Sequence, residues 1–181
     1  MPVLTSMGLK KIWVADANSA DNTQFPAFGT GWADLGDVYK DTCQLTDTDP
    51  EETKHESETS ERKIILNGEV ETTVQLSLMD PDLTHLAKYF GGTITGNAGA
   101  RHWIRPKKVP YKEWAVLQQP EEGIVMGCPA CIITPKFEIT YSKTGIALVP
   151  LTIKYLGKQH ALEVASGWDP TSSSTTAVPT A

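Results

Sequence analysis

The chain is short of cationic side chains, of cysteines and of long apolar runs, and each shortage excludes a class of protein. Its 16 Lys and Arg stand against 22 Asp and Glu, which gives a formal net charge of -6. That is the wrong sign for a protein that binds DNA by neutralising phosphates. Three cysteines cannot form a complete disulfide framework, so folding must rest on packing. No stretch approaches the roughly 20 apolar residues that span a bilayer.

Signals for secretion and motifs for catalysis are missing as well. Residues 1–8 lack the charged-then-apolar pattern of a secretion signal, so we expect the chain to fold in a cytoplasm. There is no Gly-x-Ser-x-Gly elbow, no Gly-x-x-x-x-Gly-Lys loop and no Asp-x-Asp-x-Asp-Gly calcium loop. We therefore predict that the protein is not an enzyme, uses no cofactor, and has no catalytic, cofactor-binding or metal site.

Hydrophobic residues make up 40% of the 181 residues and the aromatic residues are spread along the whole length, which predicts a folded chain with a real core. We expect one β domain over residues 1–167. Residues 168–181 are rich in Ser, Thr and Pro without an apolar period, so we expect a flexible tail there.

The first half of the chain favours β-strands. We expect a short strand over residues 10–15 and a second over residues 36–45. Residues 46–61 are strongly acidic and carry almost no apolar side chains, which predicts a long exposed hairpin or a partly mobile loop. Asn67-Gly68 is a strong signal for a type I′ hairpin turn. The strand after it alternates strictly, with one face formed by Val70, Thr72, Val74, Leu76 and Leu78.

One short helix is expected after that strand. Asp80 is a candidate N-cap with Pro81 at the first helical position and Asp82 complementing the helix dipole. Gly91-Gly92 supplies a C-terminal stop. The apolar spacing of the helix gives one buried face, made of Leu83, Leu86, Ala87 and Phe90.

Shorter strands are expected at residues 102–104, 114–117 and 124–126, followed by a hairpin whose turn is residues 142–145. The second arm of that hairpin has an apolar face of Ala147, Val149, Leu151, Ile153 and Tyr155. Pro150 lies within this arm. Because proline cannot donate to a ladder, we expect an edge or a bulge there.

Cys128-Pro129-Ala130-Cys131 is the one motif with the spacing of a redox pair or half a zinc site. No second ligand pair exists, because Cys43, His55, His85, His102 and His160 occur singly. The motif also runs into a predicted strand, whereas thioredoxin-like chemistry needs a helix start. We interpret both residues as buried structural thiols.

Trp103 and Trp114 occur near several cations, Arg101, Arg105, Lys107 and Lys108. Such a basic-aromatic patch has two interpretations. One is a surface that stacks a base or a sugar, and the other is a rim of core aromatics covered by the stems of the cations. We favour the second.

Three segments in this order carry a resemblance to a known family: residues 32–39 with the acidic stretch behind them, residues 80–92 after a strand, and the closing turn at residues 142–145. The chain resembles the tail tube (major tail) proteins of long-tailed bacteriophages over about residues 9–157. These proteins share their fold with the inner tube of type VI secretion systems. The Cys-Pro-Ala-Cys segment is not part of that resemblance.

The resemblance implies a mainly β fold, a β-sandwich or barrel with one short helix and edge strands available for pairing between subunits. It also implies stacked hexameric rings that form a conduit for DNA ejection, with DNA passing the lumen without specific binding. The implied partners are copies of the chain and the tape measure, tail tip and terminator proteins, with no membrane. The implied location is the virion tail, after assembly in the host cytoplasm, with residues 46–61 making contacts between rings. The competing classes are a β-sandwich module that binds carbohydrate or protein, and a small enzyme.

Overall fold

The structure is a computed structural model that describes residues 7–18, 21, 23–56, 63–79, 82–138, 145–165 and 167–172. The fold is mainly β, as predicted, with one helix. The strands are β1 (Met7–Asp16), β2 (Ala33–Asp34), β3 (Gln44–Thr48), β4 (Glu52–Glu56), β5 (Lys63–Asn67), β6 (Glu71–Met79), β7 (Thr93–Thr95), β8 (His102–Ile104), β9 (Glu113–Glu122), β10 (Val125–Pro135), β11 (Leu148–Tyr155) and β12 (His160–Leu162), and the helix is α1 (Leu83–Phe90). None of the described helices has the length and apolarity needed to cross a membrane.

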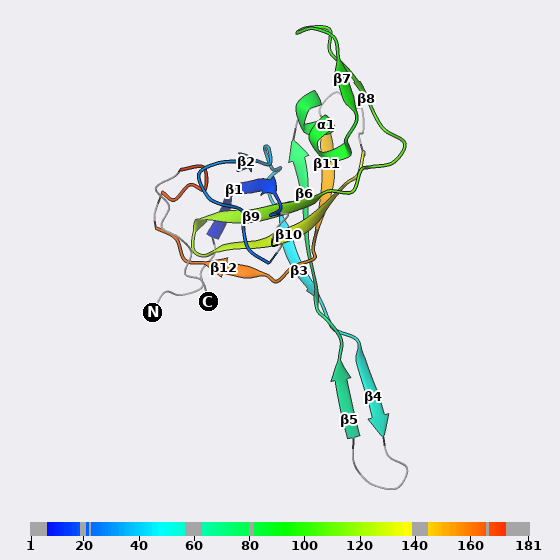
Figure 1. Ribbon diagram of the computed structural model, residues 1–181, viewed down its shortest axis with the longest axis vertical. Helices are drawn as coiled ribbons and strands as arrows, with labels where there is room; N and C mark the ends of the chain where they lie inside the picture. The colour runs from blue at the N-terminus through cyan, green and yellow to red at the C-terminus, as the bar shows by residue number, and fades with distance from the viewer. Residues whose placement is uncertain are drawn as a thin grey trace.

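Most strands belong to one curved antiparallel sheet in the order β2-β1-β9-β10-β11-β6-β3. In Figure 1, β6 and β11 stand upright and β9 and β10 cross them at a steep angle. The long strand β10 connects the two halves. Its first part pairs with β12 and its second part with β11, on the side opposite β9. The remaining strands form two small hairpins, β4–β5 and β7–β8.

A crossing segment, residues 35–39, connects the two distant ends of this sheet. Leu35 N donates to Ile12 O of β1 at 2.8 Å, and three residues later Val38 forms a bridge with Leu78 of β6. Tyr39 N also donates to Ser77 O at 2.8 Å. At this end the curved sheet is therefore closed over its core, as in a barrel.

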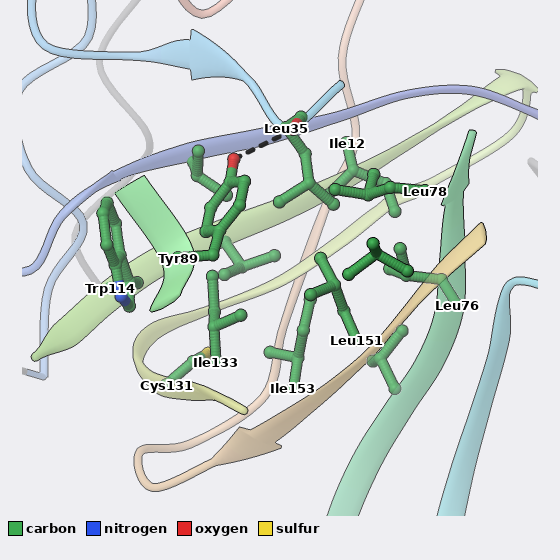
Figure 2. Packing of buried hydrophobic residues seen from close by; sticks show 14 of the residues in the cluster. Ile12, Leu35, Leu76, Leu78, Tyr89, Trp114, Cys131, Ile133, Leu151 and Ile153 are labelled. Carbon is green, nitrogen blue, oxygen red and sulfur yellow. Dashed lines mark hydrogen bonds between the residues drawn. The ribbon is translucent and has the colours of Figure 1, made fainter. Parts of the chain in front are cut away.

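The core fills the space inside this curve. Figure 2 shows side chains from β1, β6, β9, β10, β11 and α1 meeting there. Ile12, Leu35, Val74 and Ile153 are each fully buried. Tyr89 of α1 donates its hydroxyl to the Leu35 carbonyl at 2.9 Å, which satisfies a buried polar pair. A second cluster, centred on Trp13, Trp32, Ala115, Leu117 and Leu162, packs outside the sheet, with Trp168 against it.

The two best-patterned strands are confirmed. Along β6, Thr72, Val74, Leu76 and Leu78 are buried and alternate with more exposed residues. Val70 lies beyond β6 and is exposed. In β11, Val149, Leu151 and Ile153 are buried in the same way. Period-2 patterns therefore located the core face correctly in both strands.

The helix forms where expected but begins later. Its N-cap is Asp82, whose side chain accepts from His85 N at 2.8 Å, so the assignment of Asp80 as the cap was wrong. Asp80 and Pro81 lie outside the described residues. Leu86 and Phe90 are buried as predicted, together with Tyr89. Gly91 and Gly92 both have positive φ, at 74° and 102°, which confirms the glycine stop.

The expected strand over residues 36–45 is mostly not a strand. Gly36 has φ of 124° and Asp41 has φ of 60°, and Thr42 N bonds back to Tyr39 O. These turns leave only the Val38 bridge before β3 begins at Gln44. The positive φ values break the extended path that the apolar pattern predicted.

Asn67-Gly68 is not a hairpin turn. β5 ends at Asn67 and pairs with β4, while β6 begins at Glu71 and pairs with β3. The chain therefore continues in one direction through Gly68, which has no positive φ. Its N–H donates to Glu51 O at 2.9 Å, so it joins the same long hairpin as the acidic segment.

Pro150 is in an inner strand, so the expected edge was wrong. β11 pairs with β10 on one side and β6 on the other. The Pro150 carbonyl accepts from Lys136 N at 2.8 Å, just after β10 has ended. Since N and C=O of one strand residue point the same way, the proline nitrogen faces this open end and no ladder bond to β6 is lost. A strand was also expected before the turn at residues 142–145. The structure describes only a bridge there, between Glu138 and Leu148. Residues 139–144 lie outside the described residues.

Near the C-terminus, Trp168 contacts Phe28, and Gly29 N donates to the carbonyl of buried Pro170 at 2.8 Å. Residues 173–181 lie outside the described residues. The assignment of residues 1–167 to one domain and 168–181 to a tail stays a prediction.

Leu86→Asp should lower the free energy of unfolding by about 3 kcal/mol or more, because it places a carboxylate in the core beside Tyr89 and Phe90. Thr84→Asp, at an exposed position of the same helix, is the matched control and should leave the melting temperature nearly unchanged. Thermal unfolding followed by circular dichroism measures both. Equal melting temperatures for Leu86→Asp and the wild type would show that α1 does not contribute to the core.

Candidate assembly surfaces

The most prominent surface feature is a long hairpin arm, which we define as residues 49–70. The arm continues the ladder between β3 and β6, which belongs to the large sheet. Beyond a short break in the pairing, β4 pairs with β5 within the arm. Figure 1 shows β4 and β5 projecting far from the body. An isolated two-stranded hairpin is only marginally stable in water. In the described part the acidic segment therefore belongs to a paired hairpin, and β4 and β5 pair with no other described strand.

Among the described residues, the strands β1 and β3 of the large sheet each leave part of an edge unpaired. β1 pairs with β9 along its length, but on its other side β2 covers only Trp13 and Val14. β3 pairs with β6 alone, and all five of its residues are exposed. Each free edge carries backbone donors and acceptors that another strand can pair with.

A groove of about 1050 Å³ lies along the free part of β1. Its apolar lining includes Leu9, Tyr39, Leu45, Ile124 and Met126. Tyr39 and Leu45 are exposed, at 40% and 36%. The free backbone edge and this apolar lining together form a surface suited to a β-strand of another chain.

The Cys128–Cys131 segment forms a corner in β10. The register of β10 against β9 shifts between the two cysteines, which marks a β-bulge. The Ala130 carbonyl accepts from both Leu156 N and Gly157 N, at 2.9 Å and 3.1 Å. These bonds hold the connection between β11 and β12 against the bulge. The motif thus places the point where β10 changes partners.

Both thiols of this corner are fully buried. A hydrogen bond from Cys131 lowers the pKa of Cys128 to about 7, and burial acts against it. Burial raises the pKa of Cys131 strongly. Cys128 Sγ contacts the Ala130 carbonyl at 3.1 Å. Neither sulfur is accessible to a substrate, which supports the interpretation as structural thiols.

Metal-ligating residues do not converge in the part of the chain that the structure describes: no group of three or more His, Cys, Asp or Glu has the geometry to hold an ion there. His85 lies on α1, His102 on β8 and His160 on β12. The absence of catalytic, cofactor and metal sites stays a prediction.

The predicted basic-aromatic patch is divided between two places. Arg105 stacks over Phe90 and Phe137, at 5.0 Å and 6.0 Å from the ring centroids, and Trp103 donates to Gly91 O at 3.0 Å. Trp114 lies elsewhere, beneath Lys88 and Lys112. The predicted patch did not include these two lysines, because the pocket that they form draws residues from α1, the segment after β8, and two strands.

Comparison with known proteins decides the family. The sequence model described as "Phage tail tube protein" matches residues 3–169. The chain belongs to this family. It is a family of structural virion proteins of the phage tail and not of enzymes, which confirms the resemblance seen in the sequence and the prediction that the protein is not an enzyme.

Solved structures with similar chains come from contractile injection systems. One is a sheath-tube complex of an extracellular contractile injection system in its extended state, with 11% identity, coverage of 87% of this chain and 92% of that chain, and a TM-score of 0.46. Another is the baseplate of the anti-feeding prophage, with 10% identity, coverage of 90% and 96%, and a TM-score of 0.43. A third is the sheath/tube terminator of the first system, with 10% identity, coverage of 89% and 99%, and a TM-score of 0.42. A search of curated proteins finds no match.

The buried corner of this tail tube protein predicts the reactivity of its thiols. In the native protein only half-buried Cys43 should react with Ellman's reagent at mildly alkaline pH, although the pKa of Cys128 is low enough for a thiolate there. All three thiols should react in denaturant. Fast modification of two or more native thiols would contradict the buried geometry.

The double variant Cys128→Ser, Cys131→Ser tests the same corner through its stability and its metal binding. It should fold, bind no metal and lose about 1–2 kcal/mol of stability, since a hydroxyl replaces each buried sulfur. In denaturant it should show one reactive thiol. A metal that binds to the wild type and not to this variant would show that the corner is a metal site.

Proposed function

We propose that this protein assembles into stacked hexameric rings that form the tail tube of a long-tailed phage, the conduit through which DNA is ejected. The observation that carries the proposal is the family match over residues 3–169. The proposal includes assembly in the host cytoplasm, contacts with the tape measure, tail tip and terminator proteins, and no membrane partner.

The free sheet edges support assembly by strand pairing between subunits. β1 and β3 expose unpaired backbone edges among the described residues, and a groove lined by both apolar and charged side chains follows the first. Exposed edges of this kind favour aggregation in a monomer unless another chain covers them. In a ring, the edge of one subunit pairs with the edge of the next, and a continuous sheet then lines the lumen.

The charge of the chain supports a conduit that does not retain its cargo. The net charge is -6, so a ring of six copies repels a polyanion on average. Residues that bind DNA phosphates tightly would slow passage. A lumen lined mainly by carboxylates and neutral side chains allows DNA to slide without specific binding.

Deleting residues 52–67 should give a folded protein that cannot extend a tube. Glu51 and Gly68 are already joined by a hydrogen bond of 2.9 Å, so the shortened chain closes a hairpin on the intact β3–β6 ladder. Size-exclusion chromatography with negative-stain microscopy should show rings and tubes for the wild type, and rings or monomers for the deletion. Full-length tubes from the deletion variant would show that residues 52–67 make no contact between rings that tube growth needs.

Hydrogen exchange gives an independent measurement on the same arm. Because β4 and β5 pair only with each other, their amides should exchange fast in the free subunit. They should become protected in tubes. Protection already present in the monomer would contradict a contact formed on assembly.

A further inference from the structure

The two ends of the molecule carry opposite charge. From Leu83 to Lys112 no Asp or Glu occurs, while the same thirty residues contain Lys88, Arg101, Arg105, Lys107, Lys108 and Lys112. These residues belong to α1, to the β7–β8 hairpin and to the segment after it, at the end of the long axis opposite the arm (Figure 1). We name this region the basic end.

A pocket of about 580 Å³ opens in the basic end, between α1, residues 108–112 and strands β9 and β10. Lys112 Nζ lies 4.0 Å from the ring centroid of Trp114, and Lys88 Nζ lies 5.7 Å from the same ring. Burial lowers the pKa of Lys88 and the charge of Lys112 lowers it further, while the charges of Asp16 and Asp34 act in the opposite direction. The pocket therefore holds two cations close enough to repel each other.

Three carboxylates lie around this pocket without forming an ion pair with Lys88: Asp16, Asp34, and Glu113, which accepts from the Tyr111 hydroxyl. Asp16 pairs with Lys112 at 2.6 Å. Within the described ranges, no carboxylate forms an ion pair with Lys88 or Lys108. Tyr111 stands at the rim with 71% of its surface exposed. An acidic segment with an apolar side chain between its carboxylates would match both the charge and the exposed ring.

The base of the arm has that composition. Asp47, Asp49, Glu51, Glu69 and Glu71 are all exposed, and neither residues 44–51 nor residues 68–72 contain a Lys or Arg. Val70 lies between two of the carboxylates and is 55% exposed. Strand β6, nine residues long, runs from this acidic region toward α1 and separates it from the basic end by roughly 25–30 Å.

We propose that the acidic arm base of one copy docks on the Lys88–Lys108–Lys112 pocket of the next copy, so that tube subunits stack head to tail. The inference rests on the proposed tube function and names the two surfaces that meet. A second copy is favoured over nucleic acid because the chain itself carries the complementary carboxylates, at the end of β6 that is remote from α1. Such a contact joins different surfaces of two copies and can be repeated without limit.

Charge reversal on each side tests the contact. The first variant combines Lys108→Glu with Lys112→Glu, and the second combines Glu69→Lys with Glu71→Lys; all four side chains are exposed. Each variant alone brings like charges together, so the concentration needed for tube formation should rise by about tenfold or more. A 1:1 mixture of the two variants should restore assembly, because each then supplies the other's missing charge.

A control is Lys158→Glu, which reverses one charge at an exposed position outside both surfaces and should assemble like the wild type. Thermal unfolding verifies that every variant is folded. Sedimentation velocity and negative-stain microscopy measure assembly, and a gel-shift assay with a short DNA duplex measures nucleic-acid binding.

Each outcome is decisive. The docking is supported if each variant alone fails to assemble tubes at the wild-type concentration and the 1:1 mixture assembles them. Single variants that form tubes like the wild type, or a mixture that stays stalled, overturn it while leaving the tube function intact. Wild-type binding to DNA that the Lys108→Glu, Lys112→Glu variant loses, with unchanged assembly, assigns the basic end to nucleic acid instead. A wild type that never assembles overturns the proposed function and this inference together.

Discussion

The crossing segment, residues 35–39, is the constraint on which the other features of the fold depend. It bonds to Ile12 of β1 at its start and to Ser77 and Leu78 of β6 at its end, so it holds together two strands that lie far apart in the sheet. The Tyr89 hydroxyl fixes α1 to the same segment through Leu35. Leu35 is fully buried, so the closure is made inside the core, away from competing water. The closure leaves part of the β1 edge and the outer edge of β3 without a partner strand among the described residues.

Local patterns predicted the elements well and their partners poorly. The alternation in β6 and β11 and the Gly91-Gly92 stop were correct because each depends on residues close in sequence. The Asn67-Gly68 turn failed because its glycine belongs to a longer hairpin whose other strand begins before Glu51. The edge predicted at Pro150 was wrong because the proline nitrogen faces the open end beyond β10, and this depends on which strands pair in three dimensions. Asp80 was assigned as the helix cap and Asp82 only as a complement to the dipole, whereas the Asp82 side chain makes the capping bond.

Of the candidate surfaces, one could be predicted from the sequence and the other could not. The acidic arm was visible because its charges are consecutive in the sequence. The pocket in the basic end was not, because Lys88 of α1 is distant in sequence from Lys112 and Trp114, and only the fold brings them together. Both thiols of the cysteine motif are buried as predicted, but the position of the motif at the corner of β10 depends on the Ala130 carbonyl and its two partners in the β11–β12 connection.

The separation of charge along the long axis gives any head-to-tail stack a direction. Every internal arm base meets a pocket, yet the first and last layers each keep one surface uncovered. One terminus of the stack then displays carboxylates around Val70, and the other displays lysines around Tyr111. Proteins that close the two termini therefore meet surfaces of opposite sign, so a single kind of cap cannot serve both, and growth from one terminus is chemically distinct from growth at the other.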